Sequence, residues 1–366
     1  MNITLINDTY NWYHWGCNAT SLAISRTLIK NKHLLSYVSI QDIYNLNSVP
    51  NNINQFENQQ IFENHKNIWN KLIFDKLDNA DLILVNGEGT LHGISKQVVG
   101  LLYILYVSKK FLNKKVHLIN HSAYPIKGFD KNTDAIAKDL YYLTYKSFDF
   151  VGIREPISLE GMKKIGIKAE LTFDCLPISA EQYLKRFSKK TLRDTIVLAG
   201  GVNFNKACLK AIVNELEKYK LQGIKILILV GAKANPAQDD ENFIDMLNQY
   251  KEKLGYDIFY AKNLDEWFEC IQNAKILISG RFHYSIAAYC LSTPFLMFES
   301  NTPKNYALSK ILKVKKPIKY SGSEYEFQSK IKIYINEAIE QDNRNITNDI
   351  KELIKLAEKN FAKIKQ

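Results

Sequence analysis

The sequence predicts an α/β protein of two doubly wound lobes followed by a helical tail. Apolar runs of strand length alternate with segments of helical periodicity through most of the chain, as in parallel sheets that are covered by helices. Several of these runs end in Gly followed by polar or charged residues. A chain of 366 residues is also too long for one ordinary core. We therefore expect two Rossmann-like lobes.

The first lobe is expected over residues 1–180. Its strands are predicted at 2–7, 81–86, 116–120, 148–153 and 170–173, and its helices at 19–29, 96–112, 133–145 and 156–164. Pro156 is favourable at a first helical position. Residues 45–64 are rich in Asn and Gln without periodicity, which indicates a long loop. Residues 179–194 are charged and are expected to link the lobes.

The second lobe is expected over residues 195–320, and residues 321–366 are expected to form helices that pack back on the lobes. Strands are predicted at 195–198, 225–230, 258–261, 276–278 and 294–298. Helices are predicted at 205–219, 239–254 and 264–274, at the segment that opens with Arg281, and in the tail at 325–341 and 347–364. The tail helices are amphipathic and rich in lysine.

The composition limits the partners. A net charge of +11 favours acidic ligands or an anionic membrane surface. No nucleic-acid recognition motif accompanies this charge, so no nucleic-acid partner is expected. The five cysteines are scattered without metal-type spacing, which indicates a reduced cytosolic protein without a bound metal. No apolar run approaches the ~18 residues of a membrane span, so a cytoplasmic location with at most peripheral contact at the inner membrane face is expected.

The segment from Ser279 to His283 is the strongest candidate site. It follows a buried strand, turns at Gly280 and enters a helix whose first turn carries Arg281 and His283. Helix amino ends attract anions through their exposed N–H groups and the helix dipole. The alternative is that Arg281 is a solvated charge and His283 a core histidine.

Polar side chains follow most of the other predicted strands, and parallel strands end on one rim of their sheet. In the first lobe these residues are Asp8, His14, Asn86, Glu88, Thr90, His92, His121, Ser122, Arg154 and Asp174. In the second lobe they are Asn203, Lys233, Arg281, His283, Glu299, Asn301 and Lys304. The cationic second set suits a phosphorylated or nucleotide-bearing donor. The acids, amides and imidazoles of the first set suit a hydroxyl-rich acceptor.

Other site patterns are weak or absent. The Gly87-Glu88-Gly89 loop lacks the spacing of a phosphate-binding loop, and a close-packed strand-to-helix turn explains it equally well. The chain has no GxSxG nucleophile elbow, so a serine hydrolase is not expected. The histidines lack HExxH-type spacing, so no metal site is expected.

The chain resembles the polysaccharide pyruvyl transferase family in a set of motifs that spans about residues 2–310. They are Gly16, Asn86-Gly87-Glu88-Gly89, Gly152 to Ser158 with Lys164-Ile-Gly166-Ile and Asp174, and Ser279-Gly-Arg281-Phe-His283 with Ala287, Pro294 and Lys304. The resemblance implies a GT-B-like fold. It also implies transfer of the enolpyruvyl unit of phosphoenolpyruvate onto two sugar hydroxyls, making a ketal on a bacterial surface polysaccharide, such as a capsule or lipopolysaccharide, or on its lipid-linked precursor.

Site roles follow from this resemblance and from side-chain chemistry. Guanidinium groups bind carboxylates and phosphates in pairs of hydrogen bonds. We expect the donor to be bound by Arg281, Arg154, Lys304, Ser279, Gly280 and Asn301. We expect His283 to protonate the leaving phosphate, and Glu88 or His14 to supply the remaining acid or base. We expect the acceptor to be bound by Asp8, Asn86, His92 and His121.

Two alternatives stay open, because fold alone does not fix function. A GT-B glycosyltransferase that uses a nucleotide-activated sugar, such as a CMP-linked keto-sugar, would use the same arginines. A non-catalytic glycan-binding protein of polysaccharide assembly is the other alternative. Relatives usually carry Arg-Asp where this chain has Arg154-Glu155. No cofactor is expected, since the donor would be a co-substrate.

Overall fold

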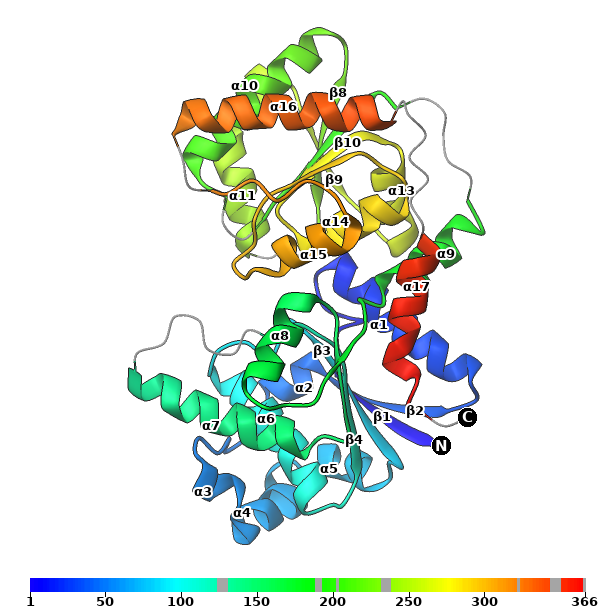
Figure 1. The fold of residues 1–366 in the computed structure, drawn as a ribbon, viewed down its shortest axis with the longest axis vertical. Helices are drawn as coiled ribbons and strands as arrows, with labels where there is room; N and C mark the ends of the chain where they lie inside the picture. The colour runs from blue at the N-terminus through cyan, green and yellow to red at the C-terminus, as the bar shows by residue number, and fades with distance from the viewer. Residues whose placement is uncertain are drawn as a thin grey trace. The chain divides into compact units, whose positions relative to one another are not determined.

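The structure is a computed structural model in which two compact units are each built on a parallel sheet (Figure 1). It describes residues 1–123, 131–187, 193–201, 204–231, 238–320, 323–342 and 350–364. The first unit contains residues 1–11, 21–175 and 354–366, and the second contains residues 12–20 and 176–353. The predicted α/β architecture of two Rossmann-like lobes is confirmed.

The first sheet has six strands in the order β2-β1-β3-β4-β5-β6, and every neighbouring pair is parallel. The strands are β1 Asn2–Asp8, β2 Leu34–Ser39, β3 Leu82–Glu88, β4 Lys115–His121, β5 Phe150–Ile153 and β6 Glu170–Leu171. The chain goes outward from β1 to β2 and then returns to the other side of β1 with β3. Such a reversal of strand order opens a crevice at the carboxyl ends of the two strands.

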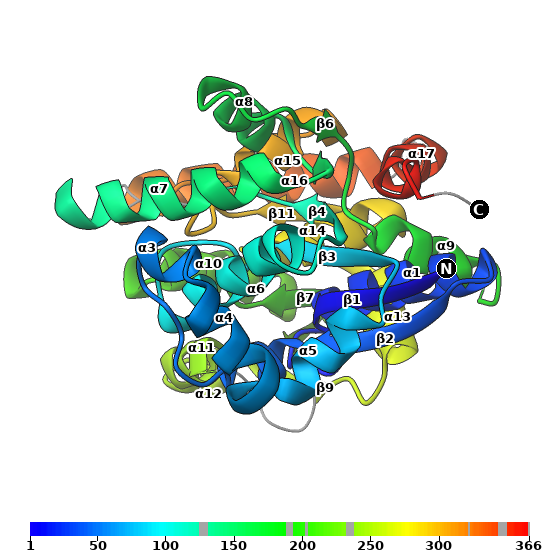
Figure 2. The same cartoon turned by 90° about the horizontal axis from the view of Figure 1, so that it is seen from below.

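Helices on the first unit pack its core, with α3, α4 and α5 gathered together (Figure 2). They are α1 Trp15–Lys30, whose residues up to Thr20 belong to the second unit, α2 Ile40–Tyr44, α3 Ile53–Phe56, α4 Gln59–Asn64, α5 Lys71–Asp78, α6 Lys96–Lys110, α7 Lys131–Ser147 and α8 Pro156–Lys164, with a π-helical turn at His65–Trp69. The loop predicted at 45–64 is wrong over α3 and α4. Side chains of Asn52 and Asn58 cap these helices, so amides start them where apolar periodicity is absent.

The second sheet has five parallel strands in the order β11-β10-β7-β8-β9. They are β7 Thr195–Ala199, β8 Lys225–Val230, β9 Asp257–Tyr260, β10 Ala274–Ser279 and β11 Phe295–Met297. The chain advances from β7 to β9 and then returns to the other side of β7 with β10. The switch point of this sheet therefore lies between β7 and β10.

Helices of the second unit depart from the predicted ones at 176–184, at 238–254 and at 304–312, the last of which was not predicted. They are α9 Leu176–Leu184, α10 Lys206–Leu221, α11 Gln238–Asn248, α12 Lys251–Leu254, α13 Leu264–Gln272, α14 Phe282–Cys290, α15 Lys304–Leu312 and α16 Glu324–Asp342. The predicted linker at 179–194 begins inside α9, where buried Tyr183 donates a hydrogen bond to Gln272 (3.2 Å). The predicted helix 239–254 is divided into α11 and α12.

The tail contributes to both units. Helix α16 runs beside α10 (Figure 1). Helix α17 (Ile350–Glu358) and a 3₁₀ turn (Lys359–Phe361) follow, and residues from 354 onward belong to the first unit. The predicted start of this last helix, at 347, lies outside the described residues. Among the described helices, none is both long and apolar enough to cross a membrane.

Asn360 ties the end of the chain to the first sheet. Its side chain is fully buried and accepts a hydrogen bond from the backbone N–H of Asn120 at the end of β4 (2.9 Å). Its amide donates to the backbone oxygens of Phe173 (2.8 Å) and Ala357 (2.9 Å). One side chain thus joins three separate segments of the first unit.

We predict that Asn360→Ala lowers the free energy of unfolding by about 2–4 kcal/mol, because the Asn120 N–H and the Phe173 carbonyl would stay buried without partners. Urea unfolding of the variant and the wild type measures this loss. Lys363→Ala, on the exposed surface nearby, is the control and should cost less than about 0.5 kcal/mol. Equal losses in the two variants would contradict the role of Asn360.

Candidate functional site

The switch point of the second unit is formed by glycines. Gly201 follows β7 and Gly280 follows β10, and a Cβ added to Gly201 would lie only 2.9 Å from the Cα of Gly280. The two backbones approach each other so closely that neither position has room for a side chain. We call Gly201 and Gly280 the glycine pair.

The turn from β10 into α14 is held by two polar side chains. Ser279 Oγ accepts a hydrogen bond from the N–H of Arg281 (3.0 Å) and donates to the Gly200 oxygen (3.2 Å). Asn305 Nδ2 donates to the oxygen of Gly280 (3.1 Å). Arg281 is the N-cap of α14, and its side chain makes no capping hydrogen bond. The N-cap of α14 is therefore not a side chain that competes with an anion for the first turn of this helix.

Arg281 lies in this turn with a carboxylate and an imidazole on its guanidinium. Its Nη2 forms an ion pair with Asp240, near the start of α11, and its Nη1 lies 3.2 Å from Nε2 of His14. The side chains of Arg281 and Asp240 are only 10% and 4% exposed. Asp240 was not predicted as a site residue. The signal for it would have been an acid in the first turn of the predicted helix 239–254.

His14 belongs to the second unit, although the sequence had placed it on the rim of the first lobe. The N–H of Trp15 donates to the oxygen of Gly231 after β8 (3.1 Å). Gly16 packs so tightly against His283 that an added Cβ would overlap the Cβ of that histidine. Residues 12–20 thus bring His14 to the first turn of α14.

Basic groups gather at this end of the second unit. Burial lowers the pKa of His14 well below its usual value, and the charges of Arg281, His283 and Lys304 lower it further. The basic side chains of Arg281, His283 and Lys304 favour an anion at this end of the second unit. Lys304 is the first residue of α15, and Asn301 in the preceding loop is exposed. Asn203 and Lys233 lie outside the described residues.

The switch point of the first unit has a strained backbone. Asn7 on β1, Glu88 on β3 and Asn120 on β4 have left-handed φ angles of 59°, 38° and 54°. These three strands are neighbours in the sheet. Left-handed backbone costs a residue with a side chain about 1 kcal/mol or more and concentrates at functional sites. In the Gly87-Glu88-Gly89 loop the strained residue is the glutamate, and neither glycine has a positive φ.

Glu88 is the centre of a buried polar network. Its Oε1 accepts hydrogen bonds from Thr9 Oγ1 (2.7 Å) and from Asn86 Nδ2 (3.1 Å). Asn86 accepts in turn from Asn120 Nδ2 (2.8 Å). Glu88 is 5% exposed and Asn86 is fully buried. Thr9 was not singled out in the sequence, and it links Glu88 to Ser21 on α1 (2.9 Å).

Asp8 is a second carboxylate beside Glu88. Burial is the main cause that raises the pKa of Asp8, and the charge of Glu88 adds to the rise. The N–H of Tyr10 donates a hydrogen bond to Asp8 (3.2 Å), which lowers the pKa of Asp8 and so offsets part of this rise. Two carboxylates at the ends of the neighbouring strands β1 and β3, one of them with a raised pKa, are a pair suited to proton transfer.

His121 lies in the interior of the first unit. It is fully buried, with Nε2 2.8 Å from the Tyr145 hydroxyl and Nδ1 3.2 Å from the oxygen of Glu88. A Cβ on Gly87 would lie 2.6 Å from that of His121, so this glycine is explained by close packing. His92 is half-buried in the loop after β3.

Arg154 and Glu155 have structural partners. Arg154 is 2% exposed, forms an ion pair with Asp174 (2.7 Å) and donates to Ser122 Oγ (2.7 Å). Glu155 caps α8 by accepting from the N–H groups of Ile157 (2.8 Å) and Ser158 (3.0 Å). The expected contact of Arg154 with a donor stays a prediction, and here its guanidinium joins the ends of β4, β5 and β6.

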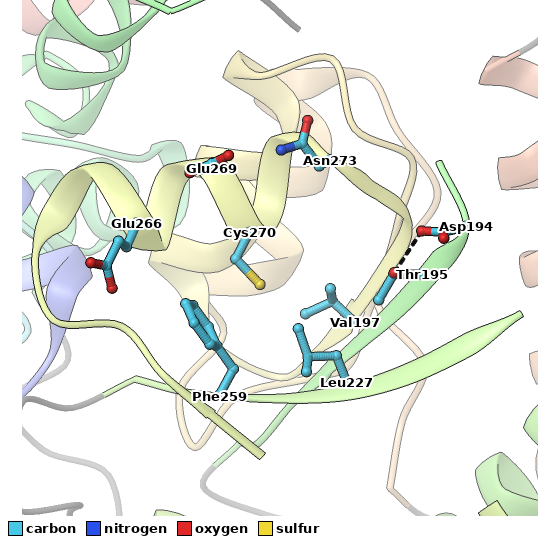
Figure 3. A pocket seen from close by; sticks show the side chains of 9 residues that line it. All are labelled: Asp194, Thr195, Val197, Leu227, Phe259, Glu266, Glu269, Cys270 and Asn273. Carbon is cyan, nitrogen blue, oxygen red and sulfur yellow. Dashed lines mark hydrogen bonds between the residues drawn. The ribbon is translucent and has the colours of Figure 1, made fainter. Parts of the chain in front are cut away.

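A hollow of about 290 Å³ lies elsewhere on the second unit, over its sheet (Figure 3). It is lined by Asp194, Thr195, Val197, Leu227, Phe259, Glu266, Glu269, Cys270 and Asn273. Its charged lining residues are all acids, so it does not suit an anionic donor. Across the described residues, no group of three His, Cys, Asp or Glu side chains is arranged to hold a metal ion.

Comparisons with known proteins agree with this fold. The family model of polysaccharide pyruvyl transferases matches residues 10–302. No curated protein sequence matches the chain. UDP-GlcNAc 2-epimerase of Methanocaldococcus jannaschii, solved with UDP-GlcNAc and UDP, is 14% identical over 98% of each chain, with a TM-score of 0.58. The Neisseria meningitidis enzyme bound to UDP-GlcNAc is 13% identical over 99% of this chain and 98% of its own, also at 0.58. These likenesses establish a GT-B-like fold.

We predict that His121 makes the protein sensitive to acid. Burial, with the nearby charge of Arg154, lowers the pKa of His121 to about 3. The unfolded chain therefore binds a proton below about pH 6.5 that the folded chain does not, so stability falls by about 1.4 kcal/mol per pH unit below that point. Urea unfolding between pH 7.5 and 5 should show a shallower decline for His121→Asn. Parallel declines in both proteins would contradict the prediction.

Proposed function

The chain belongs to the polysaccharide pyruvyl transferase family, and from this premise we propose that it transfers the enolpyruvyl unit of phosphoenolpyruvate to two hydroxyls of a sugar. The acceptor would belong to a surface polysaccharide or to its lipid-linked precursor. The observation that carries the proposal is the gathering of His14, Arg281, His283 and Lys304 at the amino end of α14. Phosphoenolpyruvate carries a phosphate and a carboxylate, and this set of groups is suited to bind both.

We assign the donor to this end of the second unit. Arg281 would bind one anionic group through its guanidinium while Asp240 fixes its orientation. Lys304 and the N–H groups of α14 would bind the other. His283 would give a proton to the departing phosphate. Ser279 and Gly280 would shape the turn, and Asn301 in the exposed loop would contact the outer part of the donor.

The reaction conserves both hydroxyl protons of the acceptor. Two sugar oxygens form bonds to C2 of phosphoenolpyruvate, and the bond from C2 to the phosphate oxygen breaks. One hydroxyl proton is transferred to the methylene carbon, which becomes a methyl group, and the other leaves with inorganic phosphate. The chemistry therefore needs a base for the hydroxyls and an acid for the methylene carbon.

We assign the base to Glu88, with Asp8 as its partner. Glu88 combines a strained backbone with a carboxylate held by Thr9 and Asn86. The raised pKa of Asp8 suits this carboxyl group to hold the proton that Glu88 has removed from the sugar hydroxyl. Asn86, His92 and His121 were the other expected acceptor residues. His92 is the one of these three that is not fully buried, so we retain it for contact with the sugar.

Transfer from a nucleotide-activated sugar is the second candidate. The fold relatives from Methanocaldococcus jannaschii and Neisseria meningitidis were solved with UDP-GlcNAc. A nucleotide diphosphate would use the same basic groups as phosphoenolpyruvate. The two candidates differ in whether the protein binds phosphoenolpyruvate or a nucleotide such as UDP or CMP.

A lipid-linked acceptor would be presented at the cytoplasmic face of the membrane, and the lysine-rich tail would then lie near anionic lipid. Helix α16 carries Lys330 and Lys332 on exposed positions. Cosedimentation of the full chain with anionic vesicles, comparing the wild type with Lys330→Glu and Lys332→Glu, tests this peripheral contact.

We predict that phosphoenolpyruvate at about 100 times its Kd stabilises the wild type by about 2.7 kcal/mol. Arg281→Lys keeps a cation beside Asp240, so the variant should fold, yet its loss of paired hydrogen bonds should weaken donor binding at least about tenfold. Thermal shift measurements test both statements. Arg186→Lys is the control, because Arg186 pairs with Asp265 on the exposed surface of the same unit. A shift with UDP or CMP alone would instead favour the sugar-nucleotide transferase.

We predict that Glu88→Gln lowers kcat by about 10²–10⁴-fold while the Kd of phosphoenolpyruvate stays within about twofold. Glutamine keeps the size of the side chain and removes its basicity. Release of inorganic phosphate in the presence of a glycan acceptor, followed by ³¹P NMR, measures the rate. Glu57→Gln, which alters a carboxylate bonded to Tyr106 in the first unit, should leave it unchanged. Normal turnover by Glu88→Gln would remove Glu88 from the mechanism.

A further inference from the structure

Tyr320 packs against the glycine pair of the second unit, and neighbouring residues hold its ring in place. Its ring stacks on Phe298 (centroids 5.5 Å apart, 13° between planes) and meets the ring of Phe204 at 5.3 Å. Its backbone N–H donates to Glu299 (2.8 Å), and its carbonyl accepts from Asn205 (3.1 Å). The position of the ring is therefore fixed by two aromatic contacts and by hydrogen bonds of its backbone.

The hydroxyl of Tyr320 points at the switch point between β7 and β10. It lies 3.0 Å from where a Cβ of Gly201 would be, and it would overlap a Cβ on Gly280. Only glycine at these two positions leaves room for it. The hydroxyl thus lies against Gly280, the residue that precedes Arg281 at the start of α14.

This hydroxyl is buried without a hydrogen-bond partner among the described residues. Tyr320 is 9% exposed. A buried polar group without a partner destabilises the folded protein, and phenylalanine would fill the same space without that cost. The causes of such exceptions include strain, a catalytic role and a water or ion, and the place of this hydroxyl at the switch point favours a ligand.

We propose that Tyr320 is a further donor-binding residue, whose hydroxyl donates a hydrogen bond to an anionic oxygen held at the amino end of α14. The identity of that anion as phosphoenolpyruvate rests on the function proposed above. The donated bond requires only an anionic oxygen at the switch point. It would therefore serve a nucleotide diphosphate equally well.

Electrostatics agree with a neutral, donating hydroxyl. Burial is the main cause that raises the pKa of Tyr320, and the charge of Arg281 opposes the rise. The phenol thus keeps its proton at neutral pH and has it available for an acceptor oxygen.

Tyr320→Phe tests the proposal, because it removes the hydroxyl alone. We expect the Kd of phosphoenolpyruvate, from calorimetry on the full chain, to rise about tenfold. The Tm of the free variant should equal or exceed that of the wild type, since a polar group without a partner is lost. Tyr103→Phe is the matched control. It removes another buried hydroxyl without a partner among the described residues, in α6 of the first unit, and should leave the Kd unchanged.

The outcomes separate this inference from the proposed function. Unchanged phosphoenolpyruvate binding by Tyr320→Phe would overturn the role of Tyr320 and leave the function standing. If the wild type binds UDP or CMP but no phosphoenolpyruvate, and Tyr320→Phe weakens that binding, the role of Tyr320 stands and the proposed function falls. A marked loss of Tm together with weaker binding would make Tyr320 a structural residue and overturn the inference.

Discussion

The ion pair between Arg281 and Asp240 is the interaction on which the cationic end of the second unit depends. Arg281, His283 and Lys304 act electrostatically on His14 there. Without a counter-charge, their repulsion would oppose the close packing of Gly16 on His283. Asp240 supplies that charge and also fixes the guanidinium beside the first turn of α14. One buried carboxylate thus allows an excess of positive charge to be collected at a strand end.

Strand order decides which of the polar strand ends can be sites. In each sheet the order reverses once, between β1 and β3 and between β7 and β10. The carboxylates of Asp8 and Glu88 lie at the first reversal, and the glycine pair with Arg281 lies at the second. His121 ends β4 and Arg154 follows β5, away from the reversal, and both are buried among protein partners. In a doubly wound sheet the ligand-binding crevice lies at the switch point, so polar residues at the ends of other strands are not part of it.

Much of the fold was predictable because apolar runs and helix signals are local. Helix α8 (Pro156–Lys164) and strand β8 (Lys225–Val230) were predicted to the residue. Strand β2 was missed because this edge strand is half exposed and lacks a continuous apolar run. The motif Ser279 to His283 located a candidate site, but Asp240 lies 41 residues before Arg281 and no local pattern connects them. Burial of His121 and the assignment of His14 to the second unit depend on contacts between distant segments, which periodicity cannot show.

Asn360 has a consequence for the order in which the protein matures. Its side chain supplies hydrogen bonds to the end of β4 and to Phe173, which precede it by 240 and 187 residues. During synthesis, these groups in the first unit have no partner until all of the second unit has been made, because that unit ends before residue 360. The amino-terminal half therefore begins folding first but is completed last. A ribosome-bound chain that stops before residue 360 would carry a first unit with open polar groups in its interior, exposed to chaperones and proteases.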